Sequence, residues 1–322
     1  MRKAMLACAA CGILAGAAIC EDTPFTYAWK PGDVYRFDFY KAITLIPQPG
    51  GTGSGADPAA ATIPASADTR KTEVAGILIF EVATEGKATM RFDSPRVTLP
   101  DVIFYSSQSE DPEVQKDKNR VIGKAIEGAL KAARWDVQLG SDGTLHIRDR
   151  KPGNFIEWAK DVENAAAWRK KSFKSMQNLI DNDLGLKTQI DDQDIFLCLN
   201  PGAPPAQSAR AEAALRPVRS AAAAGKKDGE KLRYTFSRVA PAEANKPYAI
   251  PDLGGKGDMT ATLKRVESTD GAATVDTRLS MLDTLTEDFL SDITVQYGKD
   301  SVQRQVRVQY RLKRLAPPIS KQ

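Results

Sequence analysis

The chain has 322 residues, of which 42% are hydrophobic and 27% are charged, and its 45 basic and 41 acidic side chains leave a formal net charge of +4. This composition is ordinary for a soluble globular protein, and the length suits about two domains of roughly 150 residues each. The near balance of charge argues against a nucleic-acid-binding protein, which needs a clustered basic surface.

The first 20 residues have the pattern of a secretory signal peptide. Arg2 and Lys3 precede Ala4–Ile19, a stretch of 16 uncharged and mostly apolar residues. A membrane-spanning helix needs about 20 such residues, and two acidic residues follow this stretch at once. We expect cleavage near Ala18 or Cys20 and an exported mature chain, periplasmic or extracellular, without a transmembrane segment. An N-terminal membrane anchor or a buried helix is the alternative.

The cysteines bear on anchoring and on redox chemistry. Bacterial lipoprotein signals carry a small residue directly before the acylated cysteine, whereas Ile19 precedes Cys20. Lipidation at Cys20 is therefore an alternative that this pattern does not favour. Cys198 has at most Cys20 as a partner in the mature chain, which excludes a disulfide scaffold. Because Cys198 lies in an apolar run, we expect it to be a small buried side chain rather than a nucleophile.

The first half of the mature chain alternates strand and turn signals. Stretches rich in aromatic and β-branched residues predict strands, and a segment with Pro after an N-cap residue predicts an inserted helix at about 111–134. Residues 47–68 have the Gly, Pro and Ser content of a flexible loop. The predicted strands are Val34–Ile43, Lys71–Ala83 and Ala88–Phe92, and a hairpin is predicted over Val137–Ile147.

The second half begins with helical periodicity and ends in strands. An apolar stripe from Phe155 to Ile180 predicts a helical connector within 151–200. Residues 201–230 are rich in Ala, Pro and Gly and are predicted to be a linker. The strands predicted after it are Lys231–Val239, Met259–Val266, Ala272–Leu279, Ile293–Tyr297 and Val302–Leu312.

Three pairs of similar segments occur in the same order in the two halves. Tyr35–Ala42 resembles Leu232–Val239, Gly86–Met90 resembles Gly271–Val275, and Val137–Asp142 resembles Val295–Asp300. Order and spacing are those of a duplication, although coincidence among alternating strands is the competing explanation. The predicted fold is therefore mainly β with inserted helices (α+β), made of two antiparallel β-rich units, 21–150 and 231–322, that are related by duplication.

The last predicted strand shows which of its faces is buried. Val306, Val308, Tyr310 and Leu312 alternate with Arg307, Gln309, Arg311 and Lys313. We expect the first set to point inward and the second to point toward solvent. The stripe of Arg307, Arg311 and Lys313 is a candidate for binding an anionic surface, such as lipid head groups or cell-wall polymer. The alternative is a solvated strand face that discourages pairing between sheet edges.

No recognised catalytic constellation or cofactor motif is found in the sequence. His146 is the one histidine, so a His-rich zinc site is excluded, and a Ser-His-Asp site would have to use this residue. The acidic cluster at 181–194 lacks the spacing of an EF-hand loop. We therefore predict no catalytic residues, no metal and no cofactor. A hydrolase with two paired carboxylates stays open, because two acids can meet from anywhere in the chain.

The order of long strand, turn with Gly, return strand and a hairpin with the turn Gly140-Ser141-Asp142-Gly143 resembles a class of exported bacterial proteins of unknown function, built from a duplicated β-meander after a signal peptide. The resemblance implies export and a β fold, and it implies no functional residues.

These observations favour an exported, non-catalytic β protein that binds a ligand or a partner such as a cell-envelope component. The alternatives are an envelope-polymer hydrolase with paired carboxylates and a carrier for an apolar ligand.

Overall fold

The computed structural model describes residues 25–47, 70–98, 134–151, 217–220, 223–242, 244–250, 259–297 and 300–316, together with helical residues within 124–132. The first strands are β1 (Val34–Pro47), β2 (Arg70–Thr84), β3 (Lys87–Thr98), β4 (Arg134–Leu139) and β5 (Leu145–Lys151). The others are β6 (Val218–Arg219), β7 (Ala223–Asp228), β8 (Lys231–Thr235), β9 (Arg238–Val239), β10 (Tyr248–Ile250), β11 (Met259–Asp276), β12 (Met281–Tyr297) and β13 (Asp300–Arg314).

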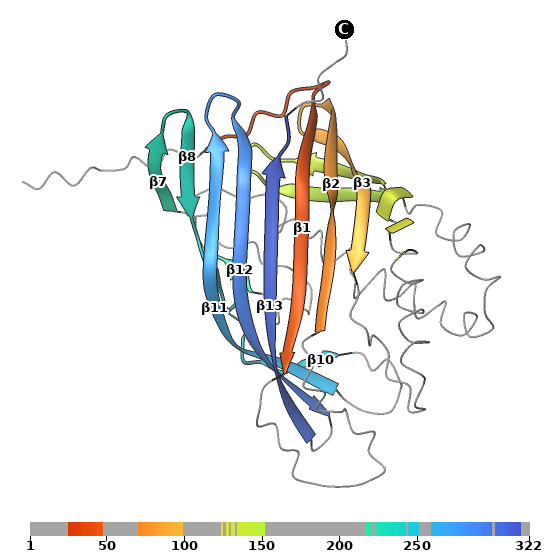
Figure 1. Cartoon of the computed structure of the whole chain (residues 1–322), viewed down its shortest axis with the longest axis vertical. Helices are drawn as coiled ribbons and strands as arrows, with labels where there is room; N and C mark the ends of the chain where they lie inside the picture. Colours follow the sequence, from red (N-terminus) through yellow and green to blue (C-terminus); the bar gives the residue numbers. More distant parts are fainter. Residues whose placement is uncertain are drawn as a thin grey trace, which may run out of the picture.

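One large antiparallel sheet dominates the molecule (Figure 1). Its strand order is β5-β4-β3-β2-β1-β13-β12-β11-β8-β7, and β10 pairs with the start of β11. The first and last long strands, β1 and β13, lie side by side at its centre. A separate two-stranded ribbon is formed by β6 and β9.

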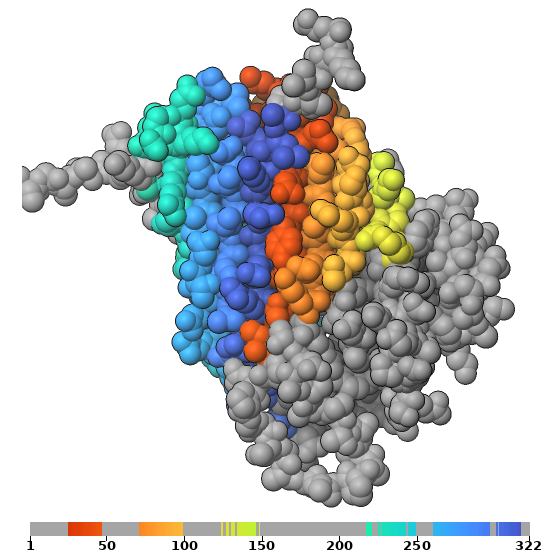
Figure 2. Space-filling view, in the orientation of Figure 1, coloured from red at the N-terminus to blue at the C-terminus, as the bar shows by residue number. Residues whose placement is uncertain are grey.

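The sheet has a buried inner face and a polar outer face, because side chains alternate along each strand. On β1, Phe37 and Phe39 are fully buried, whereas Asp38 and Tyr40 are half-buried on the outer side. Figure 1 shows β4 and β5 passing behind β1–β3 and across the upper part of the sheet, and Figure 2 shows the outer face as a continuous surface over β11, β12, β13, β1 and β2.

Aromatic side chains fill the space between the upper half of the sheet and the β4–β5 hairpin. Phe39 makes edge-to-face contacts with Phe92 and Tyr310, at ring centroid distances of 5.3 and 5.6 Å. Phe92 contacts Trp135 of β4 at 6.2 Å, and Leu145 of β5 is fully buried. Such edge-to-face pairs stabilise the core beyond simple area burial, by about 0.5–1.5 kcal/mol each.

Residues 25–30 form an aromatic clasp that holds the curved sheet together. The Tyr27 N–H donates to Ser141 O in the β4–β5 turn at 2.7 Å, and the Ala28 N–H donates to Ser280 O in the β11–β12 turn at 3.0 Å. These turns belong to strands on opposite sides of β1 and β13. The Trp29 indole Nε1–H donates to Gly140 O at 3.1 Å. One short segment therefore bridges both halves of the sheet, which requires strong curvature.

The mainly β, antiparallel character predicted from sequence is confirmed, but the two predicted units contribute to a single sheet. The structure does not show the duplication, because the matched segments occupy different places. Gly86 lies in the turn before β3 with a φ of 69°, whereas Gly271 lies inside the continuous strand β11. Tyr35–Ala42 is in the central strand β1, whereas Leu232–Val239 covers the short strands β8 and β9.

Several strands differ from their predicted extents. The two strands predicted at Met259–Val266 and Ala272–Leu279 belong to one strand, β11, which ends at Asp276, so that residues 277–279 lie in the following turn. Residues 281–292 were not predicted as strand but form most of β12, and β6 and β7 lie in the range predicted as a linker. Prediction failed on β12 because its acidic residues interrupt the apolar pattern.

Other predictions fall on residues that are not described. They concern the signal peptide, Cys20, Cys198, the loop at 47–68 apart from Pro47, the acidic cluster at 181–194 and the connector after Lys151. Within the predicted helix at 111–134, the described residues between 124 and 132 are helical. In the described ranges there is no helix long and apolar enough to cross a bilayer.

Candidate binding groove

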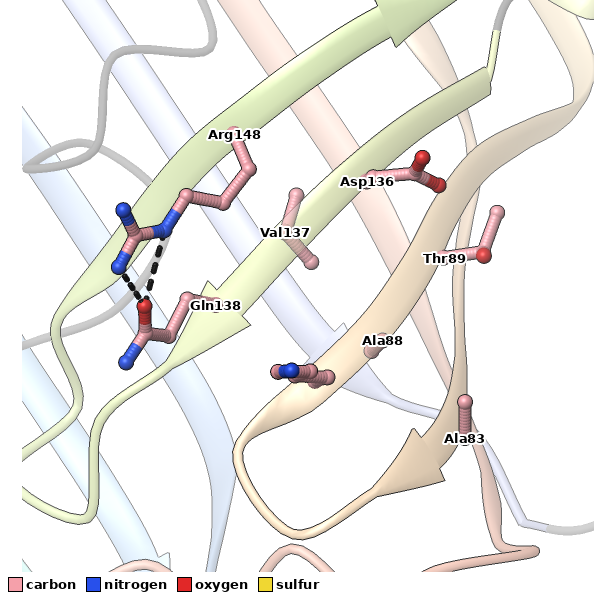
Figure 3. Close-up of a pocket in the computed structure, with 8 residues that line it drawn as sticks. Ala83, Ala88, Thr89, Asp136, Val137, Gln138 and Arg148 are labelled. Atoms are coloured by element: carbon pink, nitrogen blue, oxygen red, sulfur yellow. Dashed lines mark hydrogen bonds between the residues drawn. The ribbon is translucent and has the colours of Figure 1, made fainter.

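A groove with a volume of about 490 Å³ lies on strands β2 to β5 near one end of the sheet (Figure 3). This volume falls within the range of about 300–1,000 Å³ that is typical of small-molecule sites. Ala83 is exposed at the groove, whereas Ala88 and Val137 are 5% and 2% exposed and turn their side chains to the opposite, buried face of β3 and β4. The groove is built on hydrogen-bonded strands rather than on loops, so the backbone positions of its lining residues are well defined.

Polar side chains of the groove form two rows across neighbouring strands. Lys87 of β3 is opposite Gln138 of β4, and Thr89 is opposite Asp136. Directly opposite residues of an antiparallel pair project from the same face with Cβ atoms about 4.5–5.5 Å apart. The two rows are two residues apart along the strands, which corresponds to about 7 Å. Arg148 of β5 completes the polar lining beside Gln138.

Arg148 fixes the orientation of the Gln138 amide. Its Nε–H donates to Gln138 Oε1 at 2.9 Å, and its Nη2 donates to the same oxygen (Figure 3). Because a guanidinium has only donors, the carbonyl oxygen of the amide must face it. The amide NH₂ of Gln138 therefore points away from Arg148.

The groove carries two cations, Lys87 and Arg148, and one carboxylate, Asp136. Among the described residues, no carboxylate forms a salt bridge with either cation, whereas Asp136 has an interaction of its own. Both cationic side chains belong to exposed residues. The electrostatic character of this surface is thus weakly positive, with more hydrogen-bond donors than acceptors at the row of Lys87 and Gln138.

Two residues of β5 are Cα partners of groove residues in the strand register. His146 of β5 is the Cα partner of Gln138, and Asp149 is the Cα partner of Asp136. The single histidine thus belongs to the same hairpin as the groove. The sequence pattern predicts the hairpin but not the groove, because the groove also needs Lys87 and Thr89 from β3, about fifty residues away.

The predicted stripe on β13 lies elsewhere, on the outer face, and the structure pairs two of its three members. The Arg307 Nε–H donates to Asp288 at 2.8 Å, and this hydrogen bond lowers the pKa of the Asp288 carboxyl. Arg311 lies 3.5 Å from the Asp38 carboxylate and 5.5 Å from the centre of the Tyr40 ring. Lys313 is exposed. Binding of an anionic surface by this stripe stays a prediction.

A buried ionic cluster on the inner face holds the β6–β9 ribbon. The Glu287 side chain of β12 is 1% exposed and accepts hydrogen bonds from two arginines. The Arg219 Nε–H and the Arg238 Nη2–H donate to its two oxygens, at 2.5 and 2.8 Å. Arg219 lies over the Phe236 ring and Arg238 over the Phe289 ring, at 5.5 and 5.3 Å. The saturation of the carboxylate by two arginines indicates a structural role.

The chain matches no protein-family model and no curated protein. Among solved structures, it is similar to one described as "lipid-protein interactions in lipovitellin", with 12% sequence identity and a TM-score of 0.38. The similarity covers 92% of this chain and 26% of that chain, so the chain spans a minor part of lipovitellin. Similarity at this level does not establish a common fold.

Proposed function

We propose that this is an exported, non-catalytic binding protein that holds a small polar ligand in the groove on β2–β5. The observation that carries the proposal is the groove itself, with about 490 Å³ of space and two rows of polar side chains held by a hydrogen-bonded ladder. A concave site with a small number of well-placed polar groups is the usual form of a ligand site. Arg148 holds the amide of Gln138 before a ligand binds, so this part of the groove requires little ordering on binding.

The proposal is tested by filling the groove without changing its charge. Ala83 is exposed and lines the groove, so Ala83→Trp should occupy part of the space. The measurement is an NMR titration of the full mature chain with a panel of sugars, sugar acids, sugar phosphates and amino acids. We expect a ligand that shifts resonances of β3–β5, and loss of that response in Ala83→Trp.

The matched control is Ala240→Trp, which places the same side chain at an exposed alanine outside the groove lining. This variant should respond as the wild type does. If no compound of the panel perturbs β3–β5, or if Ala83→Trp leaves the response intact, the groove is not the binding site.

Export is part of the proposal and rests on the sequence of the first 20 residues. Mass spectrometry of the protein purified from an exporting bacterial host should find a mature N-terminus near Ala18 or Cys20. An added mass of acyl chains on Cys20 would show lipid anchoring, and an intact Met1 would contradict export through a cleaved signal.

A hydrolase with paired carboxylates is a second candidate, because Asp136 lines the groove and Asp149 is its Cα partner on the neighbouring strand β5. Two carboxyl groups across a substrate are what glycoside hydrolysis needs. Release of reducing ends from purified cell-wall polysaccharide is the measurement, with Asp136→Asn and Asp149→Asn as separate variants. Activity in the wild type that both variants abolish would establish this candidate in place of the non-catalytic one.

A carrier for an apolar ligand is favoured by a different part of the sheet. Further along β1 and β13 from the aromatic core, the inner face carries the half-buried residues Ile43, Val306 and Val308. It also carries Leu45, which is 41% exposed. Mass spectrometry of organic extracts of the purified protein is the test. Stoichiometric co-purified lipid would support the carrier, and its absence would leave the groove as the site.

A further inference from the structure

The row of Lys87, Gln138 and Arg148 offers an excess of hydrogen-bond donors. The Lys87 ammonium has three N–H donors, and no described residue accepts from them. Arg148 uses its Nε–H and one N–H of Nη2 on Gln138, and its other N–H groups make no further hydrogen bond within the described residues. The Gln138 oxygen is occupied, so Gln138 presents only its NH₂.

A surface of this kind is complementary to anionic oxygen atoms. Carboxylate and phosphate oxygens accept several hydrogen bonds at once, and hydrogen bonds from charged donors are about twice as strong as neutral ones. The nearest acceptor of the polar lining, Asp136, is one row further along β4. Because Arg148 holds the amide of Gln138, these two side chains are oriented before any ligand binds.

The second row, Thr89 and Asp136, offers hydrogen-bond acceptors in place of the excess of donors. Asp136 supplies carboxylate oxygens, and Thr89 supplies a hydroxyl that both donates and accepts. This combination is suited to the hydroxyl groups of a ligand. The two rows lie about 7 Å apart along the strands. They are therefore complementary to a ligand with an anionic group at one end and hydroxyl groups at the other.

We propose that the groove binds a monosaccharide that carries a carboxylate or phosphate group. The anionic group contacts Lys87, Arg148 and the NH₂ of Gln138, the ring lies over the β3 and β4 backbones between the two rows, and hydroxyl groups contact Asp136 and Thr89. This inference rests on the proposed function, because it names the class of ligand for the same groove.

The test compares charged and neutral forms of one sugar. D-glucuronate and glucose 6-phosphate are titrated against the full mature chain beside D-glucose, and binding is followed by NMR shifts of β3–β5. We expect the charged sugars to bind at least tenfold more tightly than D-glucose. Lys87→Met should weaken binding of the charged sugars about tenfold, because one charge-assisted hydrogen bond is lost. Higher salt should weaken it as well.

Lys264→Met is the control, because Lys264 is an exposed lysine on β11 outside the groove. It should leave all affinities unchanged. Equal binding of glucose and the charged sugars, or an unchanged affinity in Lys87→Met, would overturn the anionic ligand while leaving the groove as a binding site. If other compounds bind at β3–β5 but none of the three sugars does, the ligand class is wrong. If nothing binds there, the proposed function fails as well.

Discussion

At the scale of single residues, the most constrained group is Glu287. Burial alone would raise the pKa of its carboxyl, but the charges of Arg219 and Arg238 and their hydrogen bonds outweigh burial and lower it. A buried carboxylate and its cationic partners are stable only when all of them are present. Removal of one partner leaves an uncompensated charge in a poorly solvated site. Glu287 thus joins the β6–β9 ribbon to the main sheet.

Glu287→Ala should reduce the free energy of unfolding by about 3–5 kcal/mol, the usual cost of breaking a buried ion pair. Urea denaturation followed by circular dichroism is the measurement. Glu267→Ala is the control, because Glu267 pairs with Arg265 on the surface with both side chains more than half exposed, and exposed pairs contribute about 0–1 kcal/mol. Equal effects of the two substitutions would show that the cluster does not hold the ribbon.

The contribution of Glu287 should also depend on pH. Its pKa is lower in the folded state than the unperturbed value of 4.5. The folded state therefore binds this proton less readily, and the stabilisation is present above about pH 4.5 and is lost as the pH falls through the folded-state pKa. Glu287→Gln should be less stable than the wild type at about pH 7, and the difference should shrink on acidification below about pH 4.5. A difference that grows on acidification would contradict the assignment.

At the scale of elements, strand β11 is organised around a close approach at Gly271. A Cβ atom at this position would lie 2.2 Å from Phe236 O and 3.0 Å from its carbonyl carbon. The Phe236 N–H donates to Gly271 O at 3.0 Å, which ties the chain between β8 and β9 to β11. Glycine is required here because backbone, rather than a movable side chain, occupies the space of the missing Cβ.

Gly271→Ala should therefore destabilise the protein by about 1–3 kcal/mol, because the added methyl group overpacks against the fixed backbone of Phe236. Thermal denaturation is the measurement, and Ala272→Ser, the next residue of the same strand, is the control with an expected change below about 0.5 kcal/mol. If Gly271→Ala is as stable as its control, the chain at Phe236 moves freely and the ribbon is not fixed at this point.

At the scale of the whole molecule, the aromatic clasp of residues 25–30 connects the two sides of the curved sheet. Trp29 is 7% exposed, stacks on Tyr27 at 5.6 Å and contacts Tyr35 edge-to-face at 5.4 Å. Through the backbone of Tyr27 and Ala28, this segment joins the β4–β5 turn to the β11–β12 turn. The clasp therefore stabilises the curvature that brings the β4–β5 hairpin over the inner face.

Trp29→Ala should lower the free energy of unfolding by about 3–5 kcal/mol, as is usual when a buried tryptophan is truncated. Trp29→Phe keeps most of the packing and loses the hydrogen bond to Gly140 O, so its cost should be about 1 kcal/mol. Hydrogen exchange of both turns is the second measurement, and both should lose protection together in Trp29→Ala. Loss confined to one turn would contradict the bridging role.

Sequence reasoning identified the β class, most strand positions and the faces of β13, because alternation is a local property. Tyr310 and Leu312 are buried, and Arg307, Arg311 and Lys313 are exposed, as predicted. It could not find the groove or the buried cluster. Lys87 meets Gln138, and Glu287 meets Arg219 and Arg238, only after strands distant in sequence have paired.

What the sequence by itself determined is the alternation of apolar and polar side chains and the turns between strands, since these depend on neighbours along the chain. Tertiary structure alone decided that both halves share one sheet and that β1 pairs with β13. It also decided that residues 25–30 close the sheet across its two sides. The physical reason is that strand partners are chosen by burial and backbone hydrogen bonding over the whole chain, which no local pattern encodes.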